Sequence, residues 1–347
     1  MTKLEKLCAF GLEGGPGPLD DGEQRFLTVR NRVIEHPVFT MAVRSIARIH
    51  ERWIVTNVAG ALLIYGQSGT GKSTALDYYL KNFPRQMTPR RTTIPVLKVV
   101  TPEAPTVRSF TESILVSFGD AAASRGSAAV KTQRIIHFVK QCDVELILID
   151  EFQHFCDSTA SERRRVTDWL KNLLNECNVP VVLFGLPRAI SALNANEQLR
   201  RRFAAPVYYK EFGYHSAEEQ GLFRSVLKHL REQIPFPRGL DISEPEIAMR
   251  FHYATNGLID YVVKIIDEVV ASAPAPRFAE FSYDSLQQAF RTQIWADVPD
   301  ALNPFNPQVP PRRLDKPNEP FSIWDDPSVY TLSSRAAALL AKARSGT

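Results

Sequence analysis

The sequence is poor in cysteine. Only four occur in 347 residues, at Cys8, Cys142, Cys156 and Cys177. No two of them form a CxxC pair and no histidine stands at metal-ligand spacing from them, so the pattern excludes a zinc finger and a disulfide framework. We therefore expect reduced thiols and a cytoplasmic protein.

Long hydrophobic runs are missing too. No apolar stretch approaches the roughly 20 residues that span a bilayer, and residues 1–6 lack the basic-then-apolar layout of a signal peptide. The hydrophobic content of 44% is ordinary for a soluble globular protein. The net charge of +4 is small, so the distribution of charge matters more than its sum. We expect no membrane partner.

One motif dominates what is present. Residues 66–73 follow the pattern GxxxxGK[ST], with an apolar run at 61–65 before it and a helical segment at 74–80 after it. This strand-loop-helix context distinguishes a phosphate-binding loop from a chance run of glycine and serine. Backbone N–H groups and the helix N-terminus would face the phosphates. The residues expected to bind nucleotide here are Gly66, Gln67, Ser68, Gly69, Thr70, Gly71, Lys72, Ser73 and Thr74.

Two side chains of the loop have chemical roles. Lys72 is expected to pair with the β- and γ-phosphate oxygens, and the Ser73 hydroxyl to ligate Mg²⁺. The loop therefore predicts binding of a nucleoside triphosphate.

A second acidic motif follows. The apolar run 144–149 ends in Asp150 and Glu151, and Asp150 lies 78 residues after Lys72. A buried parallel strand would deliver this pair to the sheet edge beside the phosphate loop. Asp150 is expected to hold Mg²⁺ and Glu151 to orient the attacking water. An acidic strand end alone is a weak signal, but this spacing makes it a partner of the loop.

Three arginines, Arg200, Arg201 and Arg202, close a helical segment just before Phe203. One of them could stabilise transition-state charge on the nucleotide of a neighbouring subunit. Alternatively, the cluster is a solvated basic helix end, which the helix dipole favours. The first interpretation requires an oligomer and the second does not.

The pattern of elements indicates an α/β fold with a parallel sheet flanked by helices, followed by a small helical lid domain. We expect an N-terminal arm at 1–35, an ATPase domain at 36–213, the helical lid at 214–297 and a Pro-rich tail at 298–347. The tail composition disfavours a packed core, apart from a short helix at 334–344. The expected strands cover 61–65, 94–100, 144–149 and 179–184, and the expected helices 37–53, 74–80, 106–118, 128–141, 162–176, 217–232, 244–254, 258–272 and 283–293.

Four strings together carry a family resemblance. They are the loop 66–73, the strand 146–151 with its trailing FQHF, VPVVLFGLP at 179–187, and NEQLRRRF at 196–203. The set resembles AAA+ P-loop ATPases and, more narrowly, the TniB/TnsC family of transposition regulators, over about residues 30–275.

The resemblance implies an ATPase that uses ATP and Mg²⁺ between subunits of a homo-oligomer, in the bacterial cytosol. Such proteins form rings or filaments on double-stranded DNA. They link a target-selection protein (TniQ/TnsD-like, or an RNA-guided complex) to a transposase. Carried onto this sequence, Lys72 and Glu151 take the catalytic roles, Arg202 best fits the trans-acting arginine, and Arg201 is second.

Two departures from AAA+ relatives stand out. Residues 184–187 offer no polar sensor before Arg188. Asp260 stands near the position where many relatives carry an arginine after Gly257. We therefore expect slow hydrolysis that depends on DNA or a partner.

The expected DNA contacts lie between the two ATP motifs. Arg125 and Lys131 flank a small-residue loop that opens a helix, where they and Ser127 are predicted to hold the phosphate backbone. Ordinary solvated charge is the alternative for each residue.

Two further functions remain open. One is a helicase-loader-like AAA+ ATPase that acts on a replication protein. The other is a nucleotide-dependent switch that does not bind DNA. His154 lacks metal-ligand partners at suitable spacing, which favours a structural role.

Overall fold

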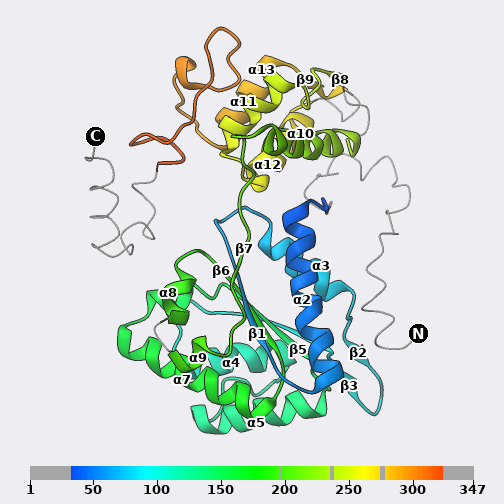
Figure 1. Cartoon of the computed structure of the whole chain (residues 1–347), viewed down its shortest axis with the longest axis vertical. Coiled ribbons are helices and arrows are strands. Elements are labelled where there is room, and N and C mark those ends of the chain that lie inside the picture. Colours follow the sequence, from blue (N-terminus) through cyan, green and yellow to red (C-terminus); the bar gives the residue numbers. More distant parts are fainter. Residues whose placement is uncertain (1–32, 195–196, 235–237, 274–277, 323–347) are drawn as a thin grey trace. The chain divides into compact units, whose positions relative to one another are not determined.

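The computed structural model describes residues 33–194, 197–234, 238–273 and 278–322 (Figure 1). Their contacts divide the described chain into two compact units. The first comprises residues 37–210, and the second comprises residues 211–322 together with 33–36.

The first unit is built on a five-stranded parallel sheet in the order β4-β5-β6-β1-β7. Its strands are β1 (Ala61–Tyr65), β4 (Val96–Val100), β5 (Leu146–Asp150), β6 (Val181–Gly185) and β7 (Val207–Tyr208). The register pairs Tyr65 with Gly185 and Val100 with Asp150. The carboxyl ends of the strands therefore meet at one edge of the sheet.

Helices cover both faces of this sheet (Figure 1). One face carries α2 (Pro37–Thr56) and α3 (Lys72–Lys81), and the other carries a larger helical layer. The helices and short helical turns of that layer are α4 (Val107–Phe118), α5 (Ala128–Gln141), α6 (His154–Asp157), α7 (Ala160–Cys177), α8 (Ala189–Asn194) and α9 (Glu197–Arg200). Side-chain caps set the starts of three of them, from Thr106, Ser127 and Thr159.

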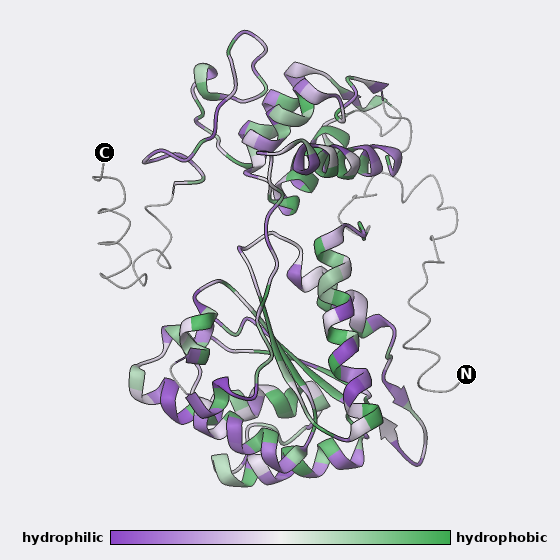
Figure 2. Ribbon diagram, in the orientation of Figure 1, coloured by the Kyte–Doolittle hydropathy of each residue, from purple (hydrophilic) through white to green (hydrophobic). Residues whose placement is uncertain are grey.

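Burial on both faces explains the unbroken apolar runs in the sequence. Every residue of β5 is buried. Ile147 and Ile149 pack with the α4, α5 and α7 layer, and Leu146 and Leu148 point to the opposite face because strand side chains alternate. In Figure 2 the strands of the sheet are mainly hydrophobic, whereas the helices around them carry both hydrophobic and hydrophilic residues.

The expected parallel sheet and its flanking helices are confirmed, with small shifts at the ends of elements. The strand expected over 94–100 begins at Val96, since Pro95 has no N–H for the ladder. A two-stranded hairpin was not expected from the sequence. Its strands are β2 (Gln86–Met87) and β3 (Thr92–Thr93).

The second unit is mainly helical and has its own apolar core. Its elements are α10 (Ala217–Glu232), β8 (Arg238–Gly239), α11 (Pro245–Thr255), α12 (Ile259–Ala271), β9 (Glu280–Phe281), α13 (Tyr283–Gln293) and the 3₁₀ helix η4 (Asp300–Leu302).

The Pro-rich segment contributes to this second core, contrary to expectation. Phe305 and Leu314 are buried within it. The buried Arg250 guanidinium donates hydrogen bonds to the carbonyl oxygens of Pro304 and Asn306, at 2.9 and 2.8 Å. These bonds satisfy backbone groups that have no regular partner. The prediction that the tail lacks a packed core is therefore wrong for residues 298–322, and the helix expected at 334–344 lies outside the described residues.

Two features are absent from the described part of the chain. It contains no helix with the length and hydrophobicity of a transmembrane span. It also contains no group of three or more His, Cys, Asp or Glu side chains placed to hold a metal ion. Cys142, Cys156 and Cys177 are free thiols.

Candidate nucleotide-binding site

The loop between β1 and α3 has a backbone that requires glycine. Gly69 and Gly71 have positive φ angles of 75° and 101°, which side chains of L residues rarely adopt. At Gly66 the constraint is a close approach, because an added Cβ would lie 2.1 Å from the carbonyl oxygen of Tyr209. The loop therefore passes tightly against Tyr209, the residue after β7, and then turns sharply into α3.

The turn presents the first residues of α3 at the carboxyl edge of the sheet. Gly71 occupies the N-cap position of α3 and makes no side-chain cap. The N–H groups of the first helical turn have no partner within the helix, and the helix dipole is positive at this end. The geometry is that of an anion-binding helix N-terminus.

Lys72 is held inside the loop. Its Nζ donates hydrogen bonds to the carbonyl oxygens of Gly66 and Gln67, at 2.8 and 2.6 Å. Burial lowers the pKa of this amine to about 8, against the opposing influence of Asp150 and Glu151. The structure places the cation at the loop that would surround the phosphates.

The two motifs meet at Ser73 and Asp150, as the sequence predicted. The Ser73 hydroxyl donates to Asp150 Oδ2 at 3.2 Å. Burial raises the pKa of Asp150, while hydrogen bonds from the Glu151 N–H and Ser73 oppose that rise. A hydroxyl and a carboxylate at this separation fit Mg²⁺, which prefers oxygen ligands from the protein and the substrate phosphates.

The backbone supports Asp150 from the neighbouring strand. The hydroxyl of Thr101, just beyond β4, donates to the Asp150 carbonyl oxygen at 2.8 Å, and the Thr101 N–H donates to the same oxygen at 3.0 Å. Thr101 is buried. The end of β5 is thereby fixed to the end of β4.

Glu151 adopts an unusual backbone conformation. Its φ is 58°, in the left-handed region that costs a non-glycine residue energy. Its side chain is 44% exposed, and one carboxylate oxygen lies 3.9 Å from His154 Nε2. The two acidic side chains thus differ: Asp150 is buried and bonded to Ser73, whereas Glu151 is partly exposed to solvent.

Gln153 is a polar residue that the sequence reasoning missed. It is buried, and its Nε2 donates to Glu151 Oε2. Its Oε1 accepts a hydrogen bond from the Leu186 N–H at 3.0 Å. The available signal was a polar residue two positions after the acidic pair, in a string otherwise flanked by phenylalanine.

The arginine cluster lies at the end of α9. Arg201 pairs with Glu197 at 2.5 Å, and Arg200 Nη1 donates to the Phe203 carbonyl oxygen at 3.4 Å. Arg202 is exposed, and its side chain has no hydrogen bond or ion pair with another described residue. Of the three, Arg202 has the guanidinium most available to a second molecule.

The three residues predicted to contact DNA are not equivalent. Arg125 and Ser127 are exposed, and Ser127 caps α5. Lys131 is fully buried and pairs with Glu112 at 2.7 Å. Its ammonium group cannot reach a phosphate backbone without breaking that pair, so the prediction for Lys131 is wrong.

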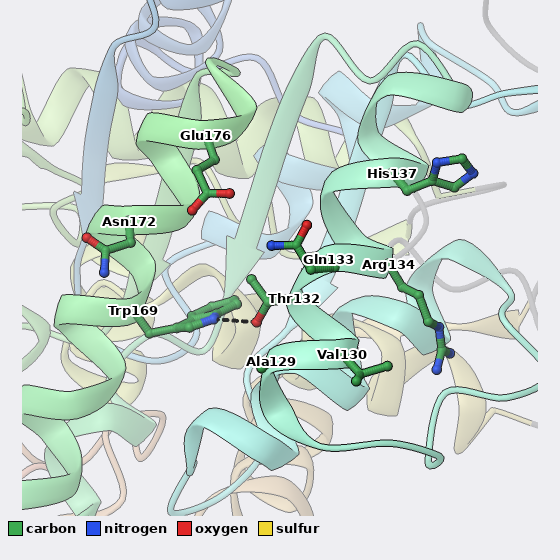
Figure 3. Close-up of a pocket in the computed structure, with 9 residues that line it drawn as sticks. All are labelled: Ala129, Val130, Thr132, Gln133, Arg134, His137, Trp169, Asn172 and Glu176. Carbon is green, nitrogen blue, oxygen red and sulfur yellow. Dashed lines mark hydrogen bonds between the residues drawn. The ribbon is translucent and has the colours of Figure 1, made fainter.

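A separate groove of about 630 Å³ lies between α5 and α7 (Figure 3). Val130 and Trp169 line it, and Trp169 Nε1 donates to Thr132 Oγ1 at 2.8 Å. The groove includes no residue of the phosphate loop and neither acidic residue. It is therefore distinct from the candidate nucleotide site.

Comparison with protein families agrees with this geometry. The family described as Bacterial TniB protein matches residues 26–214, which is more than half of the chain. This chain belongs to the TniB family. The match covers the phosphate loop, the acidic pair and the arginine cluster. None of the curated proteins with which the sequence was compared matches it.

Solved structures of other proteins share the fold of this TniB-family chain at low sequence identity. Cdc6p from Pyrobaculum aerophilum has a TM-score of 0.57 at 11% identity, covering 81% of this chain and 73% of its own. The Aeropyrum pernix ORC2 protein, solved as ADPNP-ADP complexes, has a TM-score of 0.55 at 15% identity, covering 81% and 74%.

One structure that was solved with DNA is similar to this chain to the same degree. The Aeropyrum pernix ORC1 protein in complex with DNA has a TM-score of 0.55 at 13% identity, covering 77% of this chain and 68% of its own. At these identities the likeness establishes the fold, which is that of the AAA+ ATPases.

Proposed function

We propose that this protein is an ATP-dependent regulator of DNA transposition. It oligomerises on double-stranded DNA and couples target-site selection to recruitment of a transposase. The observation that carries the proposal is the contact of Ser73 with Asp150, within a chain of the TniB family. That contact joins the phosphate loop to the acidic strand end, which is the arrangement that ATP hydrolysis requires.

The residues have separate roles in this proposal. The loop N–H groups and Lys72 bind the phosphates, while Ser73 and Asp150 hold Mg²⁺. When bound, the ion neutralises charge that develops on the phosphate oxygens. Glu151 orients the attacking water and accepts its proton.

The arginine cluster supports action between subunits. Arg202, exposed at the end of α9, is proposed to contact the γ-phosphate bound by a neighbouring copy, with Arg201 as the alternative. Nucleotide at such a contact stabilises the oligomer, and its hydrolysis releases the subunits.

DNA binding is proposed on the loop before α5. Arg134 pairs with Asp120 and donates to the carbonyl oxygen of Arg125 at 3.0 Å, which fixes the loop that carries Arg125 and Ser127. The exposed Arg125 and Ser127 would hold the phosphate backbone without reading bases. The DNA-bound ORC1 neighbour is consistent with this use of the fold.

The experiment is a comparison of wild type with Glu151→Gln in ATP and duplex DNA. The amide cannot accept the proton of the attacking water, so the hydrolysis rate falls about 10²-fold or more. Nucleotide binding persists and assemblies on DNA accumulate. Wild-type turnover and normal disassembly in the variant would remove Glu151 from this role. Stable association with a helicase hexamer, without DNA assembly, would instead favour a helicase loader.

A further inference from the structure

Gln153 has a geometry that suits a specific task. It is 4% exposed and stands at the start of α6, two residues after Glu151. Its two polar atoms have different partners, the Glu151 carboxylate and the Leu186 N–H. These partners fix the orientation of the amide, since a carboxylate requires the NH₂ group and an N–H requires the oxygen.

The bond from Gln153 restricts a carboxylate that is partly exposed to solvent. Glu151 is 44% exposed, and a long side chain at that exposure samples several rotamers. A hydrogen bond from a buried amide to Oε2 selects one of them. Charge assistance makes this bond stronger than one between neutral groups.

The other end of the amide is tied to β6. An added Cβ at Gly185 would lie 3.1 Å from Gln153 Oε1 and 2.9 Å from the Ala189 Cβ. Glycine at 185 therefore leaves the space through which the amide reaches the Leu186 N–H. The Phe152 N–H also donates to the Phe184 carbonyl oxygen at 2.8 Å. Two hydrogen bonds thus join the turn after β5 to the end of β6.

We infer that Gln153 is a positioning residue that aims the Glu151 carboxylate and links it to the end of β6. The inference rests on the proposed role of Glu151. It also accounts for the lack of a polar side chain at residues 184–187, because the polar group at this edge comes from the turn that follows the neighbouring strand β5. A displacement of the end of β6 would then change the direction in which the Glu151 carboxylate points.

Gln153 touches none of the reacting atoms. In the step it supports, the water oxygen bonds to the γ-phosphorus as the bond to the bridging oxygen breaks. ADP leaves with the electron pair of that bond, and the water proton moves to the Glu151 carboxylate. Gln153 sets only the direction of the carboxylate, which is why its loss should affect turnover and not affinity.

The test uses Gln153→Leu and Gln153→Glu in single-turnover hydrolysis with duplex DNA present. Leucine removes both hydrogen bonds. Glutamate keeps the size and the acceptor for the Leu186 N–H but places a second carboxylate against Glu151. Both variants should hydrolyse at least about tenfold more slowly, with ATP affinity within about twofold of wild type. The control is Gln141→Leu at the exposed end of α5, which should leave the rate unchanged.

A double-variant measurement separates positioning from general damage. If Gln153 acts through Glu151, then Gln153→Leu should cause no further loss in the Glu151→Gln background. An equal further loss there, or a wild-type rate in Gln153→Glu, would overturn the inference. If Gln153→Leu fails to fold, Gln153→Glu decides the matter alone. Normal hydrolysis by Glu151→Gln would instead contradict the proposed function.

Discussion

At the scale of single residues, the site contains charged side chains that are buried away from bulk water. Lys72 is a buried amine whose ammonium protons are directed at loop carbonyl oxygens. Asp150 is a buried carboxylate supported by Ser73 and by backbone N–H donation. Such groups are poised for a charged ligand, because each is already removed from bulk water.

The lowered pKa of Lys72 predicts a pH dependence of ATP binding. Phosphate requires the protonated amine, so affinity should be full below pH 8 and fall by up to about tenfold per pH unit above it. The contribution to folding stability has the opposite trend. Between pH 8 and 10.5 the unfolded chain binds more protons, so that contribution rises with pH.

The measurement is titration of ATP affinity from pH 6.5 to 9.5. Lys72→Arg serves as the control, since the guanidinium stays protonated throughout this range. Its affinity, whatever its absolute value, should show no decrease near pH 8. An equal decrease in both proteins would assign the titration to another group.

At the scale of elements, the phosphate loop depends on the strand beside it. Gly66 lies against the backbone of Tyr209, just after β7, and the Tyr209 N–H donates to the Tyr65 carbonyl oxygen at 2.7 Å. The loop therefore cannot shift without disturbing the sheet edge.

Gly66→Ala should lower both stability and ATP affinity. The new methyl group would meet backbone atoms that cannot rotate away, at a cost of about 2 kcal/mol or more in unfolding free energy. Gly221→Ala is the matched control, because no atom lies within 4 Å of its added Cβ on α10. Helix propensity predicts that this change stabilises by up to about 1 kcal/mol. Urea unfolding of the two variants compares them directly, and equal stability would contradict the packing argument.

The sequence predicted the elements that follow from local rules. Apolar runs located β1 and β5, and the GxxxxGK[ST] pattern with the acidic strand end predicted the two motifs that meet at Ser73 and Asp150. It could not reveal that Lys131 pairs with Glu112 from another helix, or that Gln153 reaches Leu186. Those contacts depend on how distant segments pack. The Pro-rich composition after Val298 led to the wrong prediction of an unpacked tail. In the structure, a buried arginine donates hydrogen bonds to backbone carbonyl groups of this segment.

At the scale of the whole molecule, the proposal requires more than one copy. In the proposal, the phosphate loop and the acidic pair of one chain bind the phosphates, ligate the metal and supply the base, while the exposed Arg202 acts on a neighbouring copy. A chain that uses ATP in this way should assemble when the triphosphate is present and separate after hydrolysis. The proposed affinity for DNA should fall steeply as the salt concentration rises, because contacts to DNA phosphates release counterions.

The mass of the protein on plain duplex DNA, followed by sedimentation velocity, tests the central claim most directly. With ATP, assemblies should form whose mass rises with DNA length, and with ADP they should be absent. Lys72→Ala, which lacks the amine proposed to pair with the phosphates, should remain unassembled in both nucleotides. A wild-type protein that stays a single copy and ignores DNA with either nucleotide would contradict the account.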